Sequence, residues 1–214
     1  MKRRLVLACL LVVSPCFSAL ADGAKIKVAC VGDSITAGVG TKKKHNSYPD
    51  QLGALLGEGY EVKNFGNSGS TMLDAGDKPY KKQKSFTDAV NYAADIYVIK
   101  LGTNDSKPQN WSKKEGFAAS TKSLVEAFQK SNPKAKVFLC TPVPVIGKGN
   151  FGINNEMVQG EIIPLIKQVA QELKLPVIDL YTALDGHPEV FPDRVHPNDD
   201  GAELMAKAVH AALD

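Results

Sequence analysis

The chain has 214 residues, of which 43% are hydrophobic and 23% are charged, which are ordinary proportions for a globular protein. Gly and Pro together make up 30 residues, too few for a collagen-like or low-complexity chain. The formal net charge is +3, and Lys2, Arg3 and Arg4 account for the whole excess. The remaining chain is balanced, which excludes a bulk basic field that would attract nucleic acid or anionic lipid.

Residues 1–21 have the pattern of a secretory signal peptide. A basic start at residues 2–4 is followed by an apolar run of nine residues, 5–13, and by the cleavage pattern ALA at 19–21. The run is too short to span a bilayer, which takes about 20 apolar residues. We therefore expect a secreted or periplasmic protein without stable membrane insertion after cleavage, and one domain over 22–214. A retained N-terminal anchor is the alternative.

Strand-like and helix-like segments alternate along 22–214. In chain order, apolar patterns predict a strand at 26–31, a helix at 48–56, strands at 60–65 and 96–101, a helix at 115–130, a strand at 136–140, a helix at 155–174, a strand at 177–180 and a helix at 199–213. This alternation predicts an α/β, three-layer sandwich with a doubly wound, five-stranded parallel sheet. Ligands bind at the carboxyl ends of the strands in such sheets.

Two cysteines, Cys30 and Cys140, remain after removal of the leader, and each lies inside a predicted buried strand. A disulfide between them requires neighbouring strands with suitable geometry, so we expect two free thiols. No C-x-x-C pair or Cys/His cluster indicates a metal site.

Chemically useful residues follow the predicted strands. The blocks are GDSIT at 32–36, NFGNSGS at 64–70, GTND at 102–105 and PDRVHP at 192–197. They bring a serine, a glycine turn, an asparagine and a histidine to one edge of the sheet. A hydroxyl nucleophile needs a base that takes its proton and donors for the oxyanion that forms on the attacked carbonyl.

The four blocks, in this order, resemble the SGNH hydrolases, also called the GDSL esterase/lipase family, over nearly all of 22–214. The stretches NFGNSGST, LGTNDSKPQNW and FPDRVHPNDDGA are most similar to secreted bacterial sialate O-acetylesterase-like and carbohydrate esterases. The resemblance implies that Ser34 is the nucleophile, His196 its general base and Asp193 the residue that orients the imidazole. It also implies an oxyanion hole made by the N–H groups of Ser34 and Gly69 and the side-chain amide of Asn104. It implies neither a metal nor a cofactor.

Each of these residues also has a structural interpretation. Taken alone, Ser34 is a helix cap, Gly69 and Asn104 are turn residues, and Asp193 is a surface acid. The occurrence of all four blocks together favours the catalytic interpretation. A spacing of three lets Asp193 reach one ring nitrogen of His196 while the other faces the serine.

The substrate is less directly encoded. Trp111 and Phe151 lie in loops and are candidates for the substrate pocket, and anchoring of those loops in the core is the equal alternative. Val195 is expected to line the acyl side, and Asp105 to act as a local hydrogen-bond acceptor. We expect hydrolysis of a short-chain, O-acetyl ester on a glycan or another small molecule. The alternatives are a lipase, lysophospholipase or thioesterase for longer acyl chains, and an inactive glycan-binding module.

Overall fold

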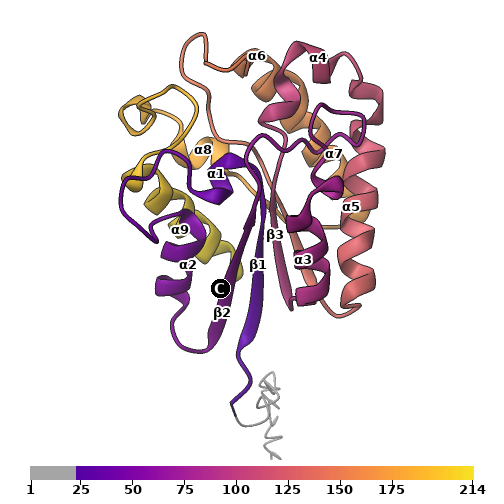
Figure 1. Cartoon of the computed structure of the whole chain (residues 1–214), viewed down its shortest axis with the longest axis vertical. Coiled ribbons are helices and arrows are strands. Elements are labelled where there is room, and N and C mark those ends of the chain that lie inside the picture. The colour runs from indigo at the N-terminus through magenta and orange to yellow at the C-terminus, as the bar shows by residue number, and fades with distance from the viewer. Residues whose placement is uncertain (1–22) are drawn as a thin grey trace, which may run out of the picture.

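The structure is a computed structural model that describes residues 23–214 (Figure 1). The predicted signal peptide, residues 1–21, lies outside the described residues. Five parallel strands form one sheet in the order β2-β1-β3-β4-β5. The strands are β1 (Ile26–Gly32), β2 (Tyr60–Gly66), β3 (Ile96–Lys100), β4 (Lys136–Cys140) and β5 (Val177–Ile178). The strand order reverses between β1 and β3, which is where ligands bind in doubly wound sheets.

Helices cover both faces of the sheet, as Figure 1 shows. One face is covered by α2 (Tyr48–Leu56), α8 (Leu180–Leu184) and α9 (Asp199–Leu213). The other face is covered by α3 (Lys84–Tyr92), α5 (Phe117–Ser131) and α7 (Ile163–Leu173). The short helices are α1 (Ser34–Ala37), α4 (Pro108–Trp111) and α6 (Asn155–Met157). Single turns complete the chain: the 3₁₀ turns η1 (Tyr80–Lys82), η2 (Asn104–Ser106), η3 (Lys114–Gly116) and η5 (Pro188–Val190), and the π-helical turn η4 (Val158–Ile162).

The side chains of β1 show why this sheet needs two helical layers. Val28 and Cys30 belong to the core cluster under α2 and α9, whereas Ala29 and Val31 belong to the cluster under α3, α5 and α7. Successive residues of a strand point to opposite faces, so an apolar run must be buried on both sides. The predicted fold class is therefore confirmed.

Some predicted boundaries differ from the structure. The fifth strand ends at Ile178, two residues early, because the side chain of Asp179 accepts a hydrogen bond from the backbone N–H of Thr182 and caps α8. Helix α3 was not predicted, since Ala89 is its only buried residue. The segment predicted as one helix over 155–174 consists of α6, η4 and α7.

Cys30 and Cys140 are free and buried, as predicted. They lie on β1 and β4, which are separated by β3. Burial raises the pKa of the Cys30 thiol to about 12, so this group is an inert part of the core. Among residues 23–214, no helix has the length and apolar character needed to cross a membrane.

Candidate active site

Ser34 lies at the first position of α1, directly after the turn that leaves β1. Asp33 caps this helix, because its Oδ1 accepts a hydrogen bond of 3.0 Å from the backbone N–H of Ile35. The cap is thus Asp33, and the interpretation of Ser34 as the cap is wrong. A Cβ on Gly32 would lie 2.0 Å from Thr36 Oγ1, so only glycine allows α1 to turn back this closely.

His196 reaches Ser34 from the loop between η5 and α9. Its Nε2 lies 2.9 Å from Ser34 Oγ, and its Nδ1 lies 2.6 Å from Asp193 Oδ2. An ionised carboxylate can only accept, so the proton of a neutral imidazole is on Nδ1 and Nε2 is left for the hydroxyl. His196 is 7% exposed and Ser34 is 8% exposed, so both are nearly buried but open to the same small cavity.

The loop holds the Asp193 carboxylate in place by its own backbone. Asp193 Oδ1 accepts hydrogen bonds from the backbone N–H groups of His196, at 2.7 Å, and of Val195, at 3.0 Å. This tight turn places Arg194 in the left-handed region, with φ at 72°. Burial raises the pKa of Asp193, but these hydrogen bonds and the imidazole outweigh it and hold the pKa below its ordinary value. The carboxylate is therefore ionised when it faces His196.

Three N–H donors lie around the same cavity. Ser34 is the first residue of its helix, so its backbone N–H has no partner within the helix. Gly69 has φ at 81°, which favours glycine, and no acceptor within residues 23–214 is paired with its backbone N–H. Asn104 Nδ2 donates to the carbonyl of Ser70 at 3.1 Å, which fixes the amide and leaves its second N–H. The structure thus brings all five predicted residues of the triad and oxyanion hole together.

The cavity at these residues has a volume of about 350 Å³. It is lined by Ser34, Val39, Ser68, Gly69, Asn104, Lys107, Phe151, Ile153 and His196. Phe151 is 57% exposed, and the centroid of its ring lies 5.7 Å from that of the His196 ring. The prediction of Phe151 as a pocket residue therefore agrees with its position.

Trp111 and Val195 do not line this cavity, so the structure does not place them where the prediction expected them. Trp111 is 6% exposed, packs edge-on against Phe117 and donates from Nε1 to Glu161 Oε2 at 3.0 Å. Trp111 is the last residue of α4 rather than a loop residue, and it anchors this short helix in the core, in line with the alternative prediction of core anchoring. Val195 is 1% exposed, because the turn that presents His196 directs the neighbouring side chain into the core.

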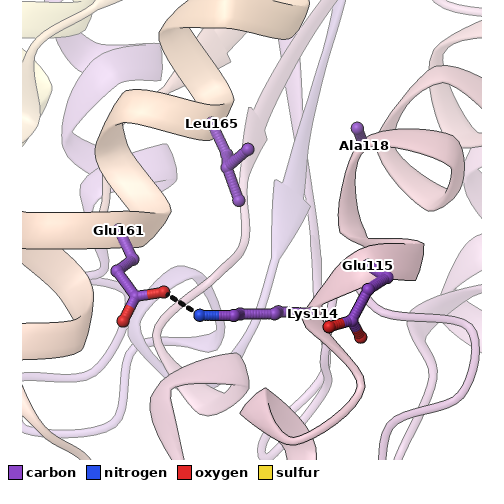
Figure 2. Close-up of a pocket in the computed structure, with 5 residues that line it drawn as sticks. All are labelled: Lys114, Glu115, Ala118, Glu161 and Leu165. Carbon is purple, nitrogen blue, oxygen red and sulfur yellow. Dashed lines mark hydrogen bonds and ion pairs between the residues drawn. The ribbon is translucent and has the colours of Figure 1, made fainter.

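A second cavity, of about 390 Å³, lies at the same Glu161 (Figure 2). Lys114 Nζ and Glu161 Oε2 form an ion pair of 2.6 Å across it. Glu115, Ala118 of α5 and Leu165 of α7 complete its lining. No serine, cysteine or histidine lines it. This cavity therefore offers no hydroxyl, thiol or imidazole for acyl transfer, although it is slightly larger than the cavity at Ser34.

Two buried ionisable side chains follow β3 or end it, and the sequence analysis predicted a role for only one of them, Asp105. Asp105 accepts hydrogen bonds from the backbone N–H groups of Met72 and Leu73, which confirms its predicted role as a local acceptor. Burial raises its pKa to about 7. Lys100, at the end of β3, forms a fully buried ion pair with Asp33, at 3.0 Å. Nothing in the apolar run IYVIKL signals that pairing. Among residues 23–214, no group of three His, Cys, Asp or Glu residues could hold a metal ion.

Comparisons with known proteins point in one direction. The sequence model of the GDSL-like Lipase/Acylhydrolase family matches residues 30–204. An acetylxylan esterase of Xylanibacter ruminicola is 40% identical over 208 aligned residues, which cover 88% of this chain and 43% of that protein. This chain thus spans less than half the length of that relative.

Solved structures share the fold. The acetyl xylan esterase AlAXEase is 26% identical, with a TM-score of 0.70 over 88% of this chain and 100% of that chain. The carbohydrate acetylesterase Est24 of Sinorhizobium meliloti is 22% identical, with a TM-score of 0.70 over 88% of this chain and 98% of that chain.

Proposed function

Since the chain belongs to the GDSL-like Lipase/Acylhydrolase family, we propose that it is a carboxylic ester hydrolase in which Ser34 is the nucleophile. One observation carries this proposal: Ser34 Oγ lies 2.9 Å from His196 Nε2, and the opposite ring nitrogen lies 2.6 Å from Asp193. A hydroxyl, an imidazole and a carboxylate in this sequence of contacts are the parts that acyl transfer to a serine requires.

The geometry supports a two-step reaction. Ser34 Oγ attacks the ester carbonyl carbon while its proton passes to His196 Nε2. The N–H groups of Ser34 and Gly69 and the amide of Asn104 stabilise the oxyanion. The imidazolium then protonates the departing alcohol, which leaves the acyl group on Ser34. A water molecule, deprotonated by His196, hydrolyses this acyl-enzyme and regenerates the serine.

We propose an O-acetyl ester on a carbohydrate as the substrate. The cavity of about 350 Å³ is at the lower end of the range for small-molecule sites, which suits an acetyl group on a sugar ring better than a long acyl chain. Its rim carries Val39 and Phe151, two of the large apolar side chains that remain exposed. The acetylxylan esterase relative supports the same substrate class.

Acetate release tests the reaction and the nucleophile together. The wild type is incubated with acetylated xylan and acetylated monosaccharides beside Ser34→Ala, with Ser112→Ala as the control. Ser112 is an exposed serine whose Oγ donates only to the carbonyl of Gln109. We expect acetate from the wild type and S112A and none from S34A. Activity of S34A at the wild-type level would refute the assignment.

A series of nitrophenyl esters with increasing acyl length tests the acyl preference. We expect the highest kcat/KM for the acetate, because the acetylxylan esterase relative supports an acetyl ester as the substrate. A maximum at eight carbons or longer would instead establish a lipase or thioesterase preference.

We further propose that the protein is exported, on the basis of the sequence pattern at residues 1–21. The mass of the protein that is recovered outside the cytoplasm shows whether the chain is exported and where its N-terminus lies. A mature chain that begins at Asp22 is expected, and an intact N-terminus on a cytoplasmic protein would contradict the proposal.

A further inference from the structure

Lys100 is the last residue of β3 and one of the largest fully buried side chains of the described chain. Its Nζ lies 3.1 Å and 3.0 Å from the two carboxylate oxygens of Asp33 and 2.7 Å from Thr103 Oγ1. An ammonium group has three N–H donors, and these three acceptors use all of them. Neither charge of the pair has contact with solvent, because both side chains are 0% exposed.

The two partners of Lys100 each precede a proposed oxyanion donor. Asp33 is followed by Ser34, whose backbone N–H is one donor, and Asp33 caps the helix that begins there. Thr103 is followed by Asn104, whose side-chain amide is another, and Thr103 lies at the start of the turn η2. Lys100 therefore connects the two turns that present these groups.

The sheet brings these turns close together. Gly32 pairs with Lys100 in the register between β1 and β3, so both strands end at the same level. A Cβ on Gly32 would lie 2.5 Å from the carbonyl of Lys100, which shows how tightly the two strand ends are packed. The backbones then diverge, towards α1 on one side and towards η2 on the other. Beyond that point, the Lys100 side chain bridges Asp33 and Thr103.

From these contacts we propose that Lys100 is a positioning residue that fixes the separation of the Ser34 and Asn104 donors by holding Asp33 and Thr103 from beneath the site. The proposal rests on the function proposed above, because it concerns the oxyanion of that reaction. Lys100 lines no part of the cavity and therefore acts only through its two partners. Donors that are held at a fixed separation favour the transition state, in which the charge on the oxygen develops, over the bound ester.

To connect Asp33 and Thr103, the Lys100 side chain must be charged as well as long enough to reach both residues. Burial lowers the pKa of Lys100, and the neighbouring Asp33 carboxylate opposes that change. A buried carboxylate without its cation would be strongly destabilising, so removal of Lys100 alone would confuse positioning with folding. The test therefore needs variants that leave no unpaired charge.

Two variants meet this condition. Thr103→Val removes one acceptor of Lys100 and keeps the ion pair and the side-chain volume. The double variant Asp33→Asn/Lys100→Met removes both charges and keeps an oxygen that can cap Ile35. The control is Thr121→Val, which removes a buried hydroxyl that donates to the carbonyl of Phe117 within α5 and is hydrogen-bonded to neither turn.

Initial rates with nitrophenyl acetate are divided by the number of active sites titrated with a serine-directed phosphonate. We expect kcat of T103V to fall about threefold to tenfold and that of D33N/K100M at least about tenfold, with KM changed less than about twofold. The pH profile of kcat/KM should keep its shape, since Asp193 and His196 are untouched. T121V should match the wild type.

A merely structural role predicts a different result. It would lower the melting temperature and the number of titratable sites but would leave kcat per site unchanged. A wild-type kcat in either folded variant overturns the proposal, and T103V alone decides if D33N/K100M does not fold. Failure of the proposed function is distinguishable, because the wild type would then release no acid or S34A would remain active.

Discussion

Replacement of Asp193 by Asn changes the charge and the hydrogen bonding behind His196 while preserving the shape of the side chain. The amide oxygen of Asn can still accept from the backbone N–H groups of Val195 and His196, as Asp193 Oδ1 does at 3.0 Å and 2.7 Å. The amide nitrogen then takes the place of Oδ2, 2.6 Å from Nδ1. Because that nitrogen donates, it favours the imidazole tautomer with its proton on Nε2, which cannot accept the proton of Ser34.

The size of the effect follows from the contacts that the productive tautomer loses. It loses a charge-assisted hydrogen bond, worth about 1.5–3 kcal/mol, and leaves a largely buried N–H facing another donor, which costs about 1–3 kcal/mol. Together these amount to about 2.5–6 kcal/mol, or a reduction in rate of about 10²–10⁴-fold. The side chain of Asp193 is 35% exposed, so water can pair with the displaced N–H. We therefore expect a reduction of about 10²–10³-fold in kcat.

The assay is the hydrolysis of nitrophenyl acetate by folded D193N, with kcat and KM measured separately. Glu189→Gln is the matched control, because Glu189 forms an exposed carboxylate–imidazole contact of 3.0 Å with His187. E189Q should retain wild-type activity. A kcat of D193N within about threefold of the wild type would show that Asp193 does not orient the base.

Three further changes test other parts of the structure. Asn104→Ala should lower kcat about 10²–10³-fold with little change in KM, measured beside Asn132→Ala, whose amide donates to the carbonyl of Ala94 away from the cavity. Phe151→Ala should raise KM for acetylated sugars about 2–10-fold, whereas Leu55→Ala, an exposed side chain outside the cavity, should not. The raised pKa of Asp105, about 7, means that the folded state binds a proton that the unfolded state releases near pH 4. The free energy of unfolding of the wild type should therefore fall relative to Asp105→Asn by up to about 4 kcal/mol as pH rises from 4 to 7, and parallel pH curves from urea denaturation would contradict this.

The parts of the fold that are buried on both faces were predictable from the sequence. Runs such as IKVACV at β1 are apolar because both helical layers cover them, and the ends of those runs located Ser34 and Asn104. Helix α3 was missed for the opposite reason, since its pattern is mostly polar and it buries only Ala89. The early end of β5 depends on the Asp179 cap, which competes with strand pairing and is invisible to a hydropathy pattern.

The candidate site was predictable where a residue type has one chemical use and not where it has several. The spacing of Asp193 and His196 has a specific geometric meaning, and the structure places both groups accordingly. Trp111 was misplaced because an aromatic residue in a loop can face the core as well as a ligand, and here Glu161 and Phe117 hold it. Lys100 escaped notice because a lysine at a strand end ordinarily reaches water, and only its pairing with Asp33 allows its burial.

Ser34 and His196 are 162 positions apart in the sequence, and this separation determines when, during folding, the protein can first hydrolyse an ester. Ser34 follows the first strand of the chain, whereas His196 follows the last. A folding intermediate in which the C-terminal segment has not yet docked therefore has the serine in place but not the histidine. Contacts between such distant segments form late, because the entropy cost of closing a long loop must be overcome before the contacts can stabilise the chain. Recovery of hydrolysis after denaturation should accordingly lag behind the recovery of helical circular dichroism and mark the completion of the native state.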